Sequence, residues 1–360
     1  MAEWDRHSVQ NIEHNRARKV RHVGSWPIHQ QDVRVVDWTP YSGLHLVAGG
    51  PPCQPFSIGG RHKGHEDDRD MWPEAVRAVR ETMPRGFLFE NVRGLTRAAF
   101  ADYLKWVRLA LAAPNVQLRP SESRQDHLRA LEAREGDADY WVSVTRVNAA
   151  DFGAAQKRHR VIIAGVRKDV SDSPAAFIPT HSRERLLWDQ WISGEYWERH
   201  GLKRPKAPER PDLSAVERLK KAGVRPAGLP WRTVRDAIAD LGDPTPGRAT
   251  AANHVFQPGA RSYPGHTGSH PDMPAKALKA GVHGVPGGEN TLLLPNGTVR
   301  YFTVREAARL QGMPDEYEFV GSWSENMRQL GNAVPTQLAE AAARTMAKVL
   351  GPASASGTRN

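Results

Sequence analysis

Short apolar runs alternate with amphipathic stretches between residues 44 and 167 of this chain. Runs of about seven or eight apolar-rich residues predict buried strands, and segments with apolar residues three or four apart predict helices. The predicted strands are 44–50 (LHLVAGG), 86–92 (GFLFENV), 140–153 and 160–167, and the predicted helices are 71–83 and 103–113. Alternating strands and helices are typical of an α/β fold with a mostly parallel sheet.

The pattern changes near residue 168, where Pro, Arg and Trp become more frequent and regular alternation stops. It returns at 303–311 and at 333–350, two segments with helical spacing. We therefore predict a first domain from 1–167 and 325–350 and a second domain from 168–324. A charged helical excursion is expected at 114–138, and the tail 351–360 is expected to be disordered.

The amino-acid composition indicates the kind of partner and the cellular compartment to expect. The net charge is +10 and the pI is near 9.8, which favours a polyanionic partner such as nucleic acid, although a basic protein without one is equally compatible. No apolar run is long enough to span a membrane, and the first twenty residues are too polar for a signal peptide. One cysteine excludes an internal disulfide and a cysteine-cluster metal site, which fits a reducing cytoplasm. We further expect no metal, no membrane association and a monomer.

The single cysteine, Cys53, lies in the stretch GGPPCQPFS. The flanking prolines restrict the backbone, and the glycines allow a close approach to a ligand. Such a turn would hold a nucleophile in one place. A lone cysteine is more often structural than catalytic, so the neighbouring residues must decide between these two roles. Cys53 and Glu90 both follow predicted strands, and ligands of such sheets bind beyond the carboxyl ends of the strands.

The flanking residues resemble the DNA cytosine-5 methyltransferase family. GGPPCQPFS is similar to its catalytic loop, FENV (89–92) to its second catalytic motif and QKRHR (156–160) to its Q-x-R-x-R motif. REAARLQGMP (305–314) and QLGNAVP (329–335) are similar to its last two motifs. Each match is weak alone, but five in order span most of the chain. The resemblance implies a Rossmann-like class I methyltransferase domain with a smaller target-recognition domain.

The resemblance also implies roles for four residues. Cys53 would add to C6 of cytosine, which makes C5 nucleophilic towards a sulfonium methyl group. Glu90 would hold or donate a proton at N3 in a desolvated pocket, and Arg160 would reach O2, with Arg158 supporting the loop or a phosphate. The base would be flipped out of double-stranded DNA, and the segment 59–70 would close over it.

S-adenosyl-L-methionine is the cofactor that the resemblance implies. Glu3 would bind the ribose hydroxyls, Trp4 would lie against the adenine, and Asp32 would receive the adenine amino group. The remaining candidates are Pro52 after the glycines, and Asn332 and Val334 in the last motif. The family's glycine-rich first turn should precede the ribose acid by about 20 residues, but only two residues precede Glu3. We therefore expect weak cofactor binding by residues 1–360. Three explanations of the missing turn are open: a start set too late, a separate polypeptide that supplies the missing piece, or a fragment.

The second domain occupies the place of the target-recognition region. Its aromatic and basic stretch 188–206 could meet phosphates, base edges or its own small core, and the Gly-rich run 279–290 could approach DNA or be a plain loop. A bacterial restriction–modification enzyme, with a possible cognate endonuclease, is the leading hypothesis. A transfer-RNA cytosine-5 methyltransferase and a truncated non-catalytic DNA-binding protein stay open as alternatives.

Overall fold

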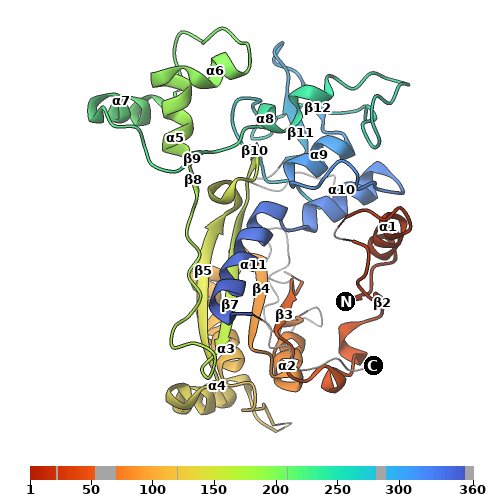
Figure 1. Cartoon of the computed structure of the whole chain (residues 1–360), viewed down its shortest axis with the longest axis vertical. Coiled ribbons are helices and arrows are strands. Elements are labelled where there is room, and N and C mark those ends of the chain that lie inside the picture. The colour runs from red at the N-terminus through yellow and green to blue at the C-terminus, as the bar shows by residue number, and fades with distance from the viewer. Residues whose placement is uncertain (22, 53–69, 120, 209, 281–288, 353–360) are drawn as a thin grey trace.

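A four-stranded sheet forms the centre of the lower half of the molecule (Figure 1). The computed structural model describes residues 1–360 except 22, 53–69, 120, 209, 281–288 and 353–360. The strand order is β3-β4-β7-β5, with bounds Leu46–Gly49, Gly86–Val92, His159–Arg167 and Tyr140–Asn148. β3 and β4 are parallel, and β7 is antiparallel to both β4 and β5. Three of the four strands therefore run in one direction, which confirms the predicted mostly parallel α/β sheet.

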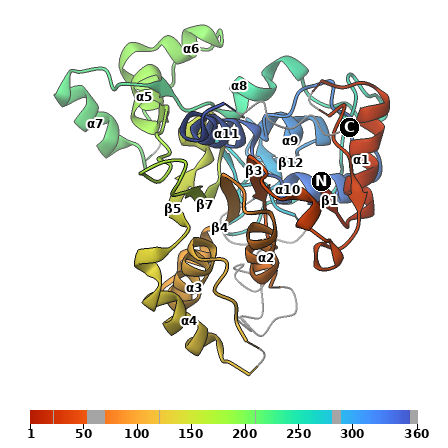
Figure 2. The same cartoon turned by 60° about the horizontal axis from the view of Figure 1, so that its bottom comes forward.

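Helices cover both faces of this sheet (Figure 2). On one face lie α2 (Trp72–Thr82) and α3 (Ala101–Ala112), with α4 (Arg124–Ala133) outside them. The other face carries α11 (Thr336–Leu350). Side chains alternate along a strand, and accordingly Phe87 and Phe89 enter the core beneath α2 and α3 whereas Leu88 packs with the α11 side. Glu90 continues the Leu88 side of β4, at the carboxyl end of the strand.

The end of β5 differs from the prediction. The strand stops at Asn148, and residues Ala149–Phe152 form the 3₁₀ helix η7, which ends at Gly153 with a positive φ of 93°. The Asn148 side chain accepts a hydrogen bond from the N–H of Ala150, which caps the short helix. The chain thus turns towards the second half of the molecule at the same sheet edge at which β4 ends.

The N-terminal segment forms a separate small unit. Strands β1 (Ala2–Glu3) and β2 (His29–Gln30) are parallel, and helix α1 (Arg6–Ala17) lies between them in sequence. Among the described residues, neither strand hydrogen-bonds to the four-stranded sheet. Two asparagines of α1, Asn11 and Asn15, instead bind the backbone of 318–320. The start of the chain is therefore held mainly through polar contacts with its C-terminal part.

The upper half of the molecule contains two further hydrophobic cores. One lies around α8 (Val234–Ile238), α9 (Val304–Leu310) and α10 (Trp323–Asn332), and the other lies within α5 (Arg183–Trp188), α6 (Glu195–Arg199) and α7 (Leu213–Ala222). The remaining strands are β6 (Gln156–Lys157), β8 (His181–Ser182), β9 (Leu229–Pro230), β10 (Ala275–Lys276), β11 (Thr291–Leu293) and β12 (Val299–Tyr301). α10 packs in the upper half, whereas α11 packs on the sheet, so the chain returns to the sheet between these two helices.

The aromatic residues of 188–206 form a core of their own. Trp191, Tyr196 and Trp197 are at most 8% exposed and pack with Leu186 and Leu187. Of the three alternatives open from sequence, the small core therefore describes these three side chains. None of the helices described here is both long and apolar enough to cross a lipid bilayer.

Candidate active site

Glu90 and Arg160 lie together at the carboxyl end of β4. Arg160 pairs across the sheet with Val92, and Glu90 pairs with Ile162, so the two side chains start from neighbouring strands on one face. The Arg160 Nε atom lies 2.5 Å from Glu90 Oε1, and only 13% and 16% of the two side chains are exposed. A guanidinium and a carboxylate this close, mostly shielded from water, interact more strongly than a surface pair.

The turn that leads to Cys53 lies against this pair. A Cβ atom added at Gly50 would be 3.7 Å from Glu90 Oε2, so the backbone of the turn lies beside the carboxylate. The Asn91 side-chain amide donates a 3.0 Å hydrogen bond to the carbonyl of Pro51. The structure thus brings Glu90, Arg160 and the start of the turn together. Cys53 and residues 59–69 of the expected mobile loop lie outside the described residues.

Asn91 is a site residue to which the sequence argument gave no role. Its amide both donates to Pro51 and accepts from the N–H of Val92 through Oδ1 at 2.9 Å, so it joins the end of β4 to the turn after β3. It is only 2% exposed. The sequence signal that could have identified Asn91 was its position directly after Glu90, since a buried amide at a strand end needs a hydrogen-bond partner on a neighbouring segment.

Residue Asp70, where the described chain resumes, is also anchored. The hydroxyl of Tyr103 on α3 donates a 2.6 Å hydrogen bond to the Asp70 carboxylate, and the Arg124 guanidinium lies 3.6 Å from it. Burial, with the nearby Asp70 carboxylate, raises the pKa of Tyr103 far above its usual value. Tyr103 therefore stays a neutral hydrogen-bond donor, and both ends of the segment 53–69 are tied to the sheet domain.

Arg158 lies elsewhere and has a different environment. It is 1% exposed, and its guanidinium donates to the carbonyls of Leu278 at 2.9 Å and Gly331 at 2.6 Å. Gln156, the first residue of the same motif, is fully buried and donates to Leu310 and Gln311. These two side chains join the sheet domain to the upper half of the molecule.

The predicted cofactor residues at the N-terminus follow adjacent strands. Glu3 ends β1 and Asp32 comes two residues after β2, so both lie at the carboxyl ends of a parallel pair. Glu3 accepts from the N–H of Asp5 through Oε1, and both Asp32 oxygens accept from Arg34. These hydrogen bonds from Arg34 hold the pKa of Asp32 below its usual value. Trp4 is 69% exposed, which leaves its ring open to a ligand.

The other three cofactor candidates lie on separate segments. Pro52 is exposed next to the turn, and Asn332 is the exposed last residue of α10. Val334 is half-buried and packs with the core beneath α11. No hydrogen bond or ion pair among the described residues joins Glu3, Trp4 or Asp32 to these three.

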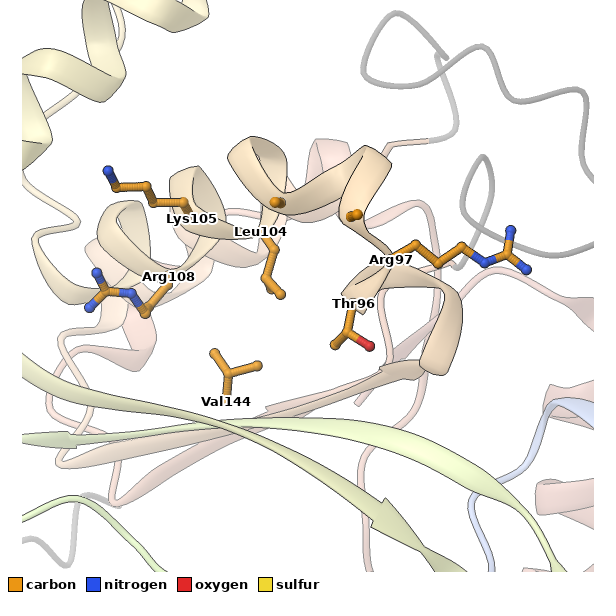
Figure 3. Close-up of a pocket in the computed structure, with 8 residues that line it drawn as sticks. Thr96, Arg97, Leu104, Lys105, Arg108 and Val144 are labelled. Atoms are coloured by element: carbon orange, nitrogen blue, oxygen red, sulfur yellow. The ribbon is translucent and has the colours of Figure 1, made fainter.

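A shallow cavity of about 330 Å³ opens between α3 and β5, and it does not include the candidate site (Figure 3). Leu104 and Val144 point towards one another across it, whereas the Arg97 guanidinium points away. Lys105 and Arg108 at its rim are paired with Glu132 and Glu135, at 2.5 and 2.7 Å. Because Lys105 and Arg108 are paired, Arg97 points away and the floor is apolar, we assign no chemistry to the cavity.

Comparisons with known proteins identify the family of this chain. The model of the family described as C-5 cytosine-specific DNA methylase matches residues 2–190 and 240–348. The chain is 29% identical over 330 residues to the Type II methyltransferase M.NgoMIV of Neisseria gonorrhoeae, covering 90% of this chain and 84% of that protein. It is 30% identical over 336 residues to the Type II methyltransferase M.PspPI of Psychrobacter sp., covering 91% and 70%.

Solved structures agree on the fold. The S. pombe Dnmt2 methyltransferase superposes with a TM-score of 0.50 at 15% identity, covering 98% of this chain and 91% of that one. The Entamoeba histolytica methyltransferase EhMeth superposes with a TM-score of 0.51 at 10% identity, covering 98% and 90%. With the family model matching most of its length, this chain belongs to the C-5 cytosine-specific DNA methylase family and is a DNA cytosine-5 methyltransferase.

Proposed function

We propose that this protein transfers a methyl group from S-adenosyl-L-methionine to C5 of a cytosine in a specific sequence of double-stranded DNA, as part of a restriction–modification system. The observation that carries the proposal is the Glu90–Arg160 pair beside the turn that leads to Cys53. The names of the Type II methyltransferase relatives support the restriction–modification context.

In this mechanism the Cys53 thiolate forms a bond to C6 of the flipped-out cytosine. The π electrons of the C5–C6 double bond shift to the C4–C5 bond and those of the C4–N3 double bond shift to N3, so negative charge develops at N3 and is shared with O2. Glu90 holds or supplies the proton at N3, and Arg160 donates a hydrogen bond to O2. After methyl transfer, C5 loses its proton and Cys53 leaves by elimination, which restores the double bond.

The ion pair gives these two groups their positions before the substrate arrives. Arg160 also donates to the carbonyl of its neighbour His159 at 2.8 Å, which limits the rotation of its side chain. Preorganised donors reduce the reorganisation that the reaction requires. In the complex we expect the edge of the cytosine ring to enter between the carboxylate and the guanidinium, so that each group exchanges part of its contact with the other for a contact with the base.

Arg158 has a positioning role in this proposal. Its two carbonyl partners belong to Leu278 and Gly331 in the upper half of the molecule, so Arg158 sets how the segments around them face Arg160. It does not touch the substrate.

S-adenosyl-L-methionine supplies the electrophilic methyl group when it is bound. Glu3 has one carboxylate oxygen without a described hydrogen bond, which suits a ribose hydroxyl, and the exposed Trp4 ring suits adenine. Asp32 would contact the adenine amino group only by sharing its oxygens with Arg34. Asn332, Val334 and Pro52 are proposed to close the pocket.

The proposal is tested by transfer of labelled methyl groups to duplex DNA that contains all short sequence contexts, with transfer RNA as the comparison substrate. We expect the wild type to incorporate methyl groups into duplex DNA and Cys53→Ser to incorporate none. Glu90→Gln should reduce the rate by about 100-fold or more. Glu340→Gln, which changes an exposed carboxylate on α11, is the matched control and should keep the wild-type rate. Incorporation into transfer RNA alone, or a wild-type rate for Glu90→Gln, would overturn the proposal.

A second experiment tests the covalent step. Duplex DNA that contains 5-fluorocytosine cannot lose its C5 substituent as a proton, so the adduct with Cys53 persists. We expect a denaturant-resistant protein–DNA complex with the wild type and none with Cys53→Ser. A complex of equal yield with both proteins would show that Cys53 is not the nucleophile.

A further inference from the structure

A helical lobe, residues 183–225, projects from the upper half of the molecule (Figure 1). It contains α5 (Arg183–Trp188), a π-helical turn Asp189–Ser193, α6 (Glu195–Arg199) and α7 (Leu213–Ala222). The family model stops at residue 190 and resumes at 240, so α6 and α7 are not part of what this chain shares with that model. The lobe has its own buried core, and its fold therefore does not depend on a bound partner.

The helical lobe carries a disproportionate share of the positive charge. It has eleven Arg and Lys residues against seven Asp and Glu residues, an excess of four out of the net +10 of the whole chain. Several of the arginines are used internally, as in the ion pairs Arg185–Asp189 and Arg183–Asp212. Six cations are exposed and make no ion pair with any described residue: Lys203, Lys206, Arg210, Arg218, Lys220 and Lys221.

Helix α7 places three of these cations on the outside of the lobe. Its Ala215 and Val216 are buried in the lobe core, and Leu219 packs against it. Arg218, Lys220 and Lys221 are all exposed, and Arg218 and Lys221 lie one turn apart. Cations near a helix C-terminus are favourable by themselves, which accounts for Lys220 and Lys221. That effect does not account for Lys203, Lys206 and Arg210, which lie outside any helix.

The base of the lobe lies at the sheet edge that carries the candidate site. Strand β8, just before α5, contacts η7, and η7 directly follows the end of β5. The indole of Trp231 donates a 2.9 Å hydrogen bond to Asp151 in η7, which fixes the return strand to the same place. Because β4 and β5 run in the same direction, their carboxyl ends meet at this edge, and the lobe extends from it (Figure 1).

We propose that the helical lobe is a phosphate-binding arm that contacts the backbone of duplex DNA flanking the target sequence, whatever the flanking bases are. The inference rests on the proposed function, since it takes double-stranded DNA as the substrate. Exposed cations without protein partners are the groups that exchange counterions with phosphates. The aromatic side chains Trp191, Tyr196 and Trp197, which could have stacked on unpaired bases, are buried in the lobe core, so the surface suits a duplex backbone and not single strands.

The test compares two triple variants that remove the same charge. The lobe variant is Arg218→Gln, Lys220→Gln and Lys221→Gln. The control variant is Arg134→Gln, Arg344→Gln and Lys348→Gln, whose residues are exposed and lie at or near the opposite end of the sheet domain, on α11 and just after α4. Glutamine is a good helix former, but both variants lose cations near a helix C-terminus, so both should fold and should lose no more than about 2 kcal/mol of stability relative to the wild type.

Binding is measured by fluorescence anisotropy on random-sequence duplexes of about 40 and about 14 base pairs over a range of KCl concentrations. Each lost phosphate contact reduces the slope of log K against log salt by about 0.9, so the lobe variant should lose about 2 to 3 units of slope on the long duplex. It should bind the short duplex nearly as the wild type does. The control variant should keep the wild-type slope on both.

Equal slopes for the lobe variant and the control variant on the long duplex would overturn the inference. An equal loss of slope on both duplexes would overturn the claim that the lobe contacts flanking DNA, because the lobe would then contact the target region itself. The methylation assay separates this result from the proposed function. Methyl transfer by the wild type with no slope change in the lobe variant rejects the arm alone, whereas the slope change without any methyl transfer rejects the proposed function alone.

Discussion

Replacing Arg158 with methionine tests whether this motif residue holds the two halves of the molecule together. Methionine keeps much of the apolar volume of the side chain but donates no hydrogen bond. The guanidinium is 1% exposed and donates to the carbonyls of Leu278 and Gly331. Both acceptors belong to buried residues, so the substitution leaves two carbonyl groups without these donors and away from water.

The expected size follows from those two bonds. A hydrogen bond from a charged donor contributes about 1.5–3 kcal/mol, and an unsatisfied buried carbonyl costs about 1–3 kcal/mol. Relaxation of the surrounding backbone is limited here, because a Cβ atom at Gly331 would lie 2.1 Å from the backbone of Lys279, so these segments are already in close contact. Part of the loss is offset because a buried charge is also removed. We expect Arg158→Met to lower the free energy of unfolding by about 3 kcal/mol.

Urea unfolding followed by far-UV circular dichroism measures this change, with the shift in midpoint at constant slope as the readout. Arg344→Met is the control, since Arg344 is 78% exposed and, among the residues that the structure describes, its one ion-pair partner is Glu340 on its own helix. It should change the free energy of unfolding by less than about 0.5 kcal/mol. Arg158→Lys should be intermediate, because one ammonium retains the charge and reaches one of the two carbonyls.

A stability of Arg158→Met within 0.5 kcal/mol of the wild type, together with loss of methyl transfer, would refute this reasoning. Arg158 would then act on the substrate instead of positioning the protein around it.

Three further predictions concern the fold. Asn15→Ala should lower the free energy of unfolding by about 2 kcal/mol, because it removes hydrogen bonds to both the N–H and the carbonyl of Glu318. Urea unfolding checks this, and an unchanged midpoint would show that water replaces the amide. Gly165→Ala should lower the free energy of unfolding by about 3 kcal/mol, since its Cβ would lie 2.1 Å from the buried Phe87 ring. Thermal or urea unfolding measures this, and wild-type stability would mean that the ring moves freely. Burial, aided by Arg232, lowers the pKa of His181, so its contribution is fully present above about pH 6.5 and is lost as the pH falls through its lowered pKa. Unfolding measured from about pH 7.5 to about pH 5.5 should show a weaker pH dependence for His181→Gln than for the wild type, and identical slopes would contradict this.

The parts of the fold that follow from local pattern were predictable. The strands β3, β4 and β7, the helices α2, α3, α9 and α11, and the position of Glu90 at a strand end all follow from spacing within a few residues. The end of β5 was misplaced because the turn at Asn148 depends on a side-chain cap and on a positive φ at Gly153, which an apolar pattern does not report.

The candidate site divides in the same way. Motif order identified Glu90, Arg160 and the turn before Cys53, and the family comparison confirms the kind of enzyme. The resemblance gave Arg160 a contact with O2 and Arg158 a supporting role at the loop or a phosphate, but it did not show that the Arg158 guanidinium is buried against the carbonyls of Leu278 and Gly331. It did not identify Asn91 as the residue that holds the turn, because its partner, Pro51, lies forty residues earlier in the chain.

By itself, the amino-acid sequence determined the residue types available for catalysis, the α/β class and the positive charge, because these depend on composition and on spacing along the chain. Only the tertiary structure decided which cations are used to hold the protein together and which stay exposed on its surface. That choice depends on which groups the fold brings within hydrogen-bonding distance and away from water. Arg158 binds two buried carbonyls, whereas Lys220 and Lys221 stay exposed on the helical lobe.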